Sequence, residues 1–214
     1  MPTAATTPEP QLGVDVIGFG AGEFAYLLNV FAGPASDRSV AVFRADDAVS
    51  DEALLSAGAS SLLARGYAHV SDEGDLGVSG VAAAVATCLG QATSWTEITL
   101  VTPDGMDNVV QVEAPDTRLL FQPRLLATWF VFAQDPAKSA PEVTAEIVRE
   151  HARENEGGSA YLVVKSLDEE RHLLVRPEGE QWTVGVPDLE QDVVAESAGL
   201  GFGELVDWIG RMHG

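Results

Sequence analysis

The chain is poor in cysteine and lysine and has no long apolar run. Of its 214 residues, one is a cysteine, Cys88, and two are lysines, Lys138 and Lys165. A single cysteine excludes an internal disulfide. The longest apolar stretch falls far below the roughly 18–20 residues that a membrane-crossing helix needs. Residues 1–10 contain no Lys or Arg and no apolar segment typical of a secretory signal. We therefore expect a cytoplasmic protein that does not contact a membrane.

Basic residues are few in comparison with acidic ones. The chain has 33 Asp and Glu against 12 Lys and Arg, a formal net charge of −21. Phosphate backbones and anionic membrane surfaces repel such a molecule, which argues against nucleic-acid binding. Hydrophobic residues make up 46% of the chain, enough for a sizeable core. The acidity favours a basic or hydrophobic protein partner, with improved solubility as the alternative explanation.

The sequence also lacks any clustered set of catalytic or metal-binding residues. No two histidines are spaced three or four apart, and no acidic cluster has the spacing of a calcium loop. The segment Gly77–Gly80 is one residue short of a nucleophile elbow. Cys88 lies in the apolar stretch 81–89, which indicates a core residue. We predict no catalytic residue, no metal site and no cofactor.

One glycine-rich segment resembles a dinucleotide-binding fingerprint. The apolar run Val14–Phe19 leads into Gly18-Phe19-Gly20-Ala21-Gly22, and Asp46 and Asp47 follow at a distance where a ribose-binding carboxylate would lie. However, the position of the third glycine is occupied by Glu23, whose carboxylate would repel a pyrophosphate. We favour an ordinary glycine turn and keep nucleotide binding by Gly18–Gly22 as an alternative.

Hydrophobic periodicity predicts an α+β fold, with antiparallel sheets flanked by helices. Ser139 and Glu142 form a capping-box pattern, and Asp51, Arg65 and Gly66 suit the two ends of another helix. Helices are expected at residues 23–31, 51–65, 81–89, 139–156 and 202–212. Strands are expected at residues 14–19, 39–44, 67–70, 76–78, 95–101, 109–113, 118–121, 125–132, 161–167, 172–175 and 182–186.

The domain organisation follows from these elements. Residues 1–12 are predicted to be a flexible tail, and residues 13–214 a single domain that consists of one unit or of two packed halves, 13–136 and 137–214. A helix at 51–65 followed by a hairpin at 67–78 is typical of a winged-helix-like portion. Since that helix offers only Arg65 as a basic residue, we expect it to serve the structure or a protein contact, not DNA.

The last predicted helix supplies the candidate partner-binding residues. Leu205, Trp208, Ile209 and Met212 fall at i, i+3, i+4 and i+7 and so share one face. Such a stripe serves either the core or a docking surface. We predict that these residues contact a protein partner.

The chain resembles the EspG-type chaperones of type VII secretion in actinobacteria. The resemblance is carried by the early helical segment Glu23–Leu28, by Leu62–Gly66 leading into a polar hairpin, and by the small-residue helix Val81–Leu89. It covers about residues 23–135. It implies a mixed α/β fold with a central antiparallel sheet and helical flanks, and a cytosolic protein that binds secreted helical-hairpin substrates.

Three functional hypotheses follow. The first is a non-enzymatic protein-binding module, a secretion chaperone or adaptor that shields an apolar helical partner. The second is a small enzyme or nucleotide-binding protein that uses Gly18–Gly22. The third is an acidic immunity protein or DNA mimic that binds a basic target.

Overall fold

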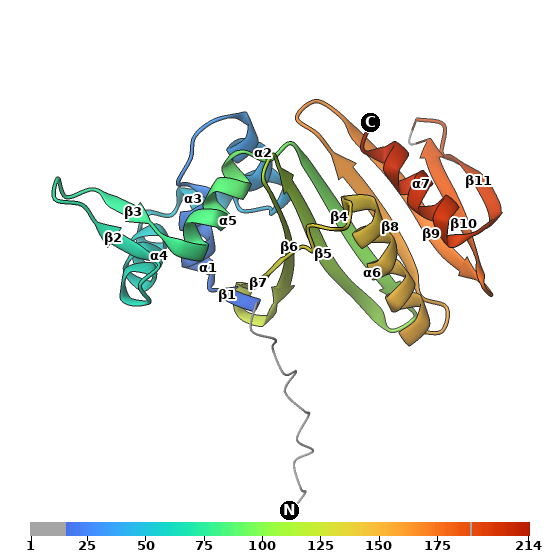
Figure 1. The fold of residues 1–214 in the computed structure, drawn as a ribbon, viewed down its shortest axis with the longest axis horizontal. Helices are drawn as coiled ribbons and strands as arrows, with labels where there is room; N and C mark the ends of the chain where they lie inside the picture. The colour runs from blue at the N-terminus through green and yellow to red at the C-terminus, as the bar shows by residue number, and fades with distance from the viewer. Residues whose placement is uncertain (1–15, 189) are drawn as a thin grey trace, which may run out of the picture.

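A computed structural model describes residues 16–188 and 190–214. It is an α+β structure in which, among the described residues, nine strands form one antiparallel sheet and two form a small hairpin (Figure 1). The helices are α1 (Ala21–Leu28), α2 (Pro34–Val42), α3 (Asp46–Ser50), α4 (Glu52–Ala64), α5 (Gly80–Gly90), α6 (Ala140–Glu154) and α7 (Phe202–Met212), with a 3₁₀ turn at Leu125–Ala127. The predicted tail 1–12 lies outside the described residues.

The strands of the large sheet run in the order β1-β7-β6-β5-β4-β8-β9-β10-β11. They are β1 (Val16–Phe19), β4 (Ser94–Thr102), β5 (Gly105–Ala114), β6 (Thr117–Arg124), β7 (Thr128–Ala133), β8 (Ser159–Lys165), β9 (Glu170–Glu178), β10 (Gln181–Asp188) and β11 (Val193–Leu200). The hairpin consists of β2 (Ala68–Val70) and β3 (Leu76–Val78). The central pair is β4 with β8, in which Ile98 lies opposite Leu162.

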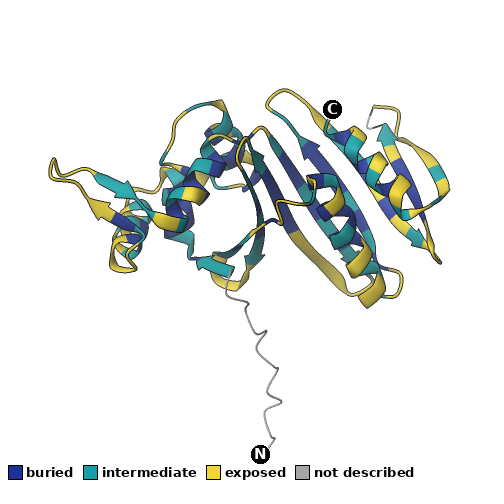
Figure 2. Ribbon diagram, in the orientation of Figure 1, coloured by how far each residue is buried: buried dark blue, intermediate teal, exposed yellow. Residues whose placement is uncertain are grey.

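Two hydrophobic cores lie on opposite faces of this sheet. Successive side chains of a strand point to opposite faces, and β4 sends Trp95 into one core and Ile98 and Leu100 into the other. Helices α1 and α5 pack over the first core, while α6 and α7 pack over the second (Figure 1). Burial is strongest where each helical layer meets the sheet, and the ends of the hairpins are exposed (Figure 2).

The first core is built around aromatic side chains from distant parts of the chain. Phe24 of α1 stacks on Trp129 of β7 with ring centroids 5.0 Å apart, and Phe43 meets Phe121 of β6 edge-on at 5.1 Å. Such aromatic pairs stabilise a core beyond the area they bury. They join the first helices to the β6–β7 hairpin, 105 residues later for Phe24 with Trp129 and 78 residues later for Phe43 with Phe121.

Most predicted elements are confirmed with shifts of a few residues, but residues 39–44 are not a strand. They belong to α2 and the residues that follow it. Pro34 is compatible with the first turn of a helix, and Ser36, Ser39 and Val42 then fall on one buried face. Ser39 Oγ accepts a hydrogen bond from the indole of buried Trp95 at 3.0 Å and donates one to the carbonyl of Leu89 at 2.8 Å. The helix therefore satisfies polar groups beside the core.

The observed strands differ from the expected ones in two further places. Residues 125–132 are not one strand, because Leu125–Ala127 form a 3₁₀ turn before β7, whereas Pro123, the predicted break, lies inside β6. Strand β11 was not predicted at all. Its sequence contains Glu196, Gly199 and few large apolar residues, and most of it is exposed, so it lacks the alternation of a half-buried strand.

Candidate functional site

The predicted partner-contact stripe on α7 lies mostly in the second core. Leu205 and Ile209 are 0% exposed and Met212 is 8% exposed. Trp208 is half-buried, and the guanidinium of Arg211 lies over its ring at 4.0 Å from the centroid. Three of the four predicted contact residues therefore serve the core in this structure, and Trp208 alone is within reach of a partner.

The glycine-rich segment adopts a strand–turn–helix path, as predicted, but its polar groups are already in use. The Gly20 N–H, at the start of α1, donates to Glu23 Oε2 at 3.0 Å. Gly22 lies against the backbone of α4: a Cβ placed on Gly58 would be 1.9 Å from the Gly22 carbonyl oxygen. β1 pairs antiparallel with β7 and is not part of a parallel βαβ unit. Gly22 therefore serves a close crossing of α1 and α4.

Glu23 occupies the position where a nucleotide phosphate would bind. Its carboxylate is buried and accepts hydrogen bonds from Ser61 Oγ at 2.7 Å and from Arg65 Nη1 at 2.6 Å. Burial raises the pKa of Glu23, but the hydrogen bonds from Ser61, Gly20 and Arg65 and the charge of Arg65 outweigh burial, so that the pKa lies below its ordinary value. The Glu23 carboxylate thus compensates the partial positive charge at the amino end of α1.

A groove with a volume of about 590 Å³ lies between α6 and the β4–β5 hairpin. Its lining comes from the strands and turn of this hairpin, from β6 and from the second half of α6. Its residues are Leu100, Thr102, Asp104, Gly105, Met106, Asp107, Val109, Gln122, Ile147, Glu150, His151, Glu154 and Asn155. We call this the α6–hairpin groove.

The α6–hairpin groove combines an apolar floor with an acidic rim. Leu100 and Val109 are buried residues of the second core, and Met106 is 71% exposed at the rim. The carboxylates come from both sides of the groove: Asp104 and Asp107 lie on the hairpin, and Glu150 and Glu154 on α6. All four are exposed residues. Asp107 already pairs with Arg124 and Glu150 with Arg153. A cationic, partly apolar ligand therefore fits best beside Asp104 and Glu154, since charge complementarity steers such a ligand and the floor buries its apolar part.

His151 lies in the groove but is engaged in the fold. Its Nε2 is 3.0 Å from the Val101 carbonyl oxygen, and its Nδ1 is 3.3 Å from the Asn155 side-chain amide. Both ring nitrogens therefore have partners, and the contact with Val101 joins α6 to β4. Within the described residues there is no group of three metal-ligating side chains. The groove is suited to binding and offers no evident nucleophile–base pair.

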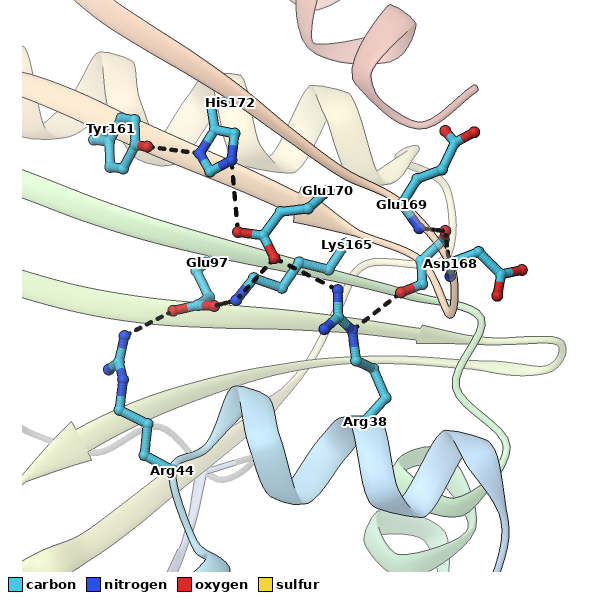
Figure 3. A network of polar contacts seen from close by, with 10 residues as sticks. Arg38, Arg44, Glu97, Tyr161, Lys165, Asp168, Glu169, Glu170 and His172 are labelled. Atoms are coloured by element: carbon cyan, nitrogen blue, oxygen red, sulfur yellow. Dashed lines mark hydrogen bonds and ion pairs between the residues drawn. The ribbon is translucent and has the colours of Figure 1, made fainter. Parts of the chain in front are cut away.

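A second polar feature lies on the opposite face, where α2 meets the middle of the sheet (Figure 3). Glu97 of β4 forms an ion pair with Lys165 of β8, and its other oxygen is 3.3 Å from Arg44. Glu170 lies 3.6 Å from Arg38 and 3.7 Å from Lys165. We call this set the central charge network. Because it links α2 to three strands, it fixes the helical layer on the sheet.

Tyr161 and His172 extend the central charge network along β8 and β9. Tyr161 Oη lies 2.6 Å from His172 Nδ1, and His172 Nε2 lies 3.5 Å from Glu170. Burial, followed by the negative charges of Glu170 and Glu97, raises the pKa of the Tyr161 phenol. The contact between Tyr161 and His172 joins β8 to β9.

The β6–β7 loop was missed by sequence reasoning, which placed it in a strand. Leu125 is 88% exposed and Leu126 94%, and Leu126 and Ala127 both have left-handed backbone angles, with φ of 61° and 53°. Left-handed conformations are unfavourable for such residues. The signal in the sequence was the pair of leucines placed directly after Pro123-Arg124, where alternation stops.

Comparison with known proteins adds no family assignment. No family model matches the chain, and no curated protein matches it. No helix within the described residues has both the length and the apolar character needed to cross a membrane.

Proposed function

We propose that this chain is a non-enzymatic protein-binding module that holds a segment of a partner protein in the α6–hairpin groove. A secretion chaperone or adaptor of the EspG type, working in the cytoplasm, is the most specific form of this proposal. The observation that supports it is the groove itself, with an apolar floor between four exposed carboxylates.

The geometry suits a helical or extended segment with one apolar and one basic side. Apolar side chains would cover Leu100, Val109 and Met106, while Lys or Arg would face the rim carboxylates. The formal net charge of −21 would speed the encounter with a basic segment and keep the complex in solution. An immunity protein or DNA mimic would share the attraction to a basic target, but its contacts would not need the apolar floor.

The nucleotide-binding alternative has less support. The Gly20 N–H at the start of α1 already donates to Glu23, and Gly22 is packed against the backbone of α4. A thermal-shift screen against nucleotides would revive that alternative if one of them stabilised the protein.

Site-specific photo-crosslinking in the native host tests the proposal. A photoreactive amino acid replaces Met106 in the groove or, as a control, Glu73 in the exposed β2–β3 turn. We expect one defined covalent adduct from position 106 only, since the partner covers the groove.

Charge reversals make the test selective. Asp104→Lys with Glu154→Lys alters the groove rim, whereas Asp72→Lys with Glu73→Lys changes the net charge equally at the β2–β3 turn. The adduct should disappear with the first pair and persist with the second. Equal loss with both pairs would show that attraction to total charge, and not the groove, selects the partner.

A further inference from the structure

A short pattern occurs twice in the chain, near each end. Gly18-Phe19-Gly20-Ala21-Gly22-Glu23 and Gly199-Leu200-Gly201-Phe202-Gly203-Glu204 share the order G-x-G-x-G-E. An apolar residue follows each copy, Phe24 in the first and Leu205 in the second. We call the two segments the first and second glycine motifs.

The two glycine motifs fold alike. Each leads from an outermost strand of the described sheet into a helix, β1 into α1 and β11 into α7. The N-cap glycines, Gly20 and Gly201, have φ/ψ of −71°/167° and −72°/167°. Each N-cap N–H donates to the glutamate three residues later, at 3.0 Å in the first motif and 2.8 Å in the second. Phe24 and Leu205 are both buried.

In the first motif, α4 covers the outer side of the helix start. Gly58 of α4 lies directly on Gly22, so closely that a Cβ on Gly22 would be 2.8 Å from the Leu54 carbonyl oxygen. Ser61 and Arg65, three and seven residues after Gly58, both donate hydrogen bonds to Glu23. A small residue, a hydroxyl and a guanidinium thus recognise the glycine–glutamate pair.

In the second motif the same side is exposed. Gly203, Glu204 and Asp207 correspond to Gly22, Glu23 and Tyr26, and all three are exposed. A Cβ built on Gly203 would meet no other part of the described chain within 4 Å. We call these three residues the outer face of α7.

We infer that the outer face of α7 docks a helix of a partner protein in the way that α1 docks α4. The occupant has a small residue where it crosses Gly203, a hydroxyl three residues later, and an Arg or Lys seven residues later that pairs with Glu204. Asp207 adds a second negative charge and so favours a basic helix. A second copy of this chain is a poor occupant, because its own α4 is already packed on α1 and its outer face of α7 is equally acidic.

This site is separate from the α6–hairpin groove and does not depend on it. It also gives a reason for keeping Gly203 in a helix, where glycine is unfavourable. In the first motif a side chain at Gly22 would separate the helices, and the same requirement applies at Gly203 once a partner helix is bound.

The chain's own α4 provides a probe of defined sequence. A fluorescent peptide of residues 51–66, held helical by a staple between Ser56 and Ser60, presents Gly58, Ser61 and Arg65. The two staple positions are exposed in the fold and lie away from the crossing. We expect the peptide to bind the full-length protein, measured by fluorescence anisotropy, whereas absence of saturable binding would overturn the inference.

Variants of both partners locate the contact. Glu204→Lys should weaken binding about tenfold, as the loss of a charge-assisted hydrogen bond implies, and a peptide carrying Arg65→Glu should restore it. Gly203→Leu should weaken binding and leave the fold intact, because that side chain points into open space. The groove variant Asp104→Lys with Glu154→Lys should bind the peptide normally. Binding unaffected by Glu204→Lys, or abolished by the groove variant, would refute the outer face of α7 as the site.

Discussion

The crossing of α1 and α4 permits a sharp prediction for Gly58→Ala. The new Cβ would lie 1.9 Å from the Gly22 carbonyl oxygen and 2.8 Å from the Glu23 nitrogen. Both are backbone atoms, so no side-chain rotation relieves the overlap. The helices must move apart by about 1.5 Å to restore an ordinary van der Waals contact of 3.4 Å or more. Overpacking of this kind destabilises a protein by about 1–3 kcal/mol or more. The higher helix propensity of alanine than of glycine offsets only about 1 kcal/mol of this.

We therefore expect Gly58→Ala to lower the free energy of unfolding by about 2 kcal/mol. Part of this loss arises because the moved helix weakens the bonds from Ser61 and Arg65 to Glu23. Urea unfolding followed by tryptophan fluorescence and far-UV circular dichroism measures the change. Gly203→Ala is the matched control, since it makes the same substitution in open space and should be neutral or slightly stabilising. If Gly58→Ala proved as stable as wild type, the close helix crossing would be wrong.

Three further predictions concern the β6–β7 loop, Glu23 and Cys88. Leu126→Gly should raise the free energy of unfolding by up to about 1 kcal/mol by relieving the left-handed angle, whereas Leu125→Gly, at an equally exposed position without that angle, should lower it; urea titrations with the reverse order would disprove the strain. Glu23 has a folded pKa below its unfolded value, so its contribution to stability is full above about pH 4.5 and is lost as the pH falls through the folded pKa. Glu23→Gln should lower the free energy of unfolding by about 1–3 kcal/mol at neutral pH and reduce its further decrease at acidic pH. If that decrease were unchanged in the variant, other carboxylates would be responsible for it. Burial, followed by the charge of Glu113, raises the pKa of the Cys88 thiol to about 12, so a thiol reagent at neutral pH should label it only as fast as the protein opens, and immediately in urea; rapid labelling of the native protein would contradict its burial.

Local signals in the sequence were sufficient to predict most helices and strands. The N-cap Ser139 and its partner Glu142 mark the start of α6, and both hydrogen bonds of the capping box form. Asp51 caps α4, and Gly66 has the left-handed angle, φ 75°, that ends it. Such signals act within one turn of chain and therefore need no knowledge of the tertiary structure.

The candidate site could not be predicted in the same way. The α6–hairpin groove depends on residues about fifty positions apart in the chain. They meet only because β8, the strand that follows α6, pairs with β4 of the hairpin and so brings α6 over it. The stripe on α7 was recognised, but periodicity does not distinguish a helix that faces its own sheet from one that faces a partner. The glycine motifs were visible in the sequence, yet only the positions of α4 and Gly58 give them a meaning.

The placement of Trp95 and Ile98 on one strand has a consequence for how the protein unfolds. Alternate side chains of β4 belong to the two cores. Unfolding of either core therefore removes the packing against one face of this strand. Cutting the chain between β7 and α6 would leave one fragment with β4 and the other with its partner β8. The helical layers on the two faces of the sheet are thus coupled through strand β4. Heating should therefore unfold both layers together in a single cooperative step.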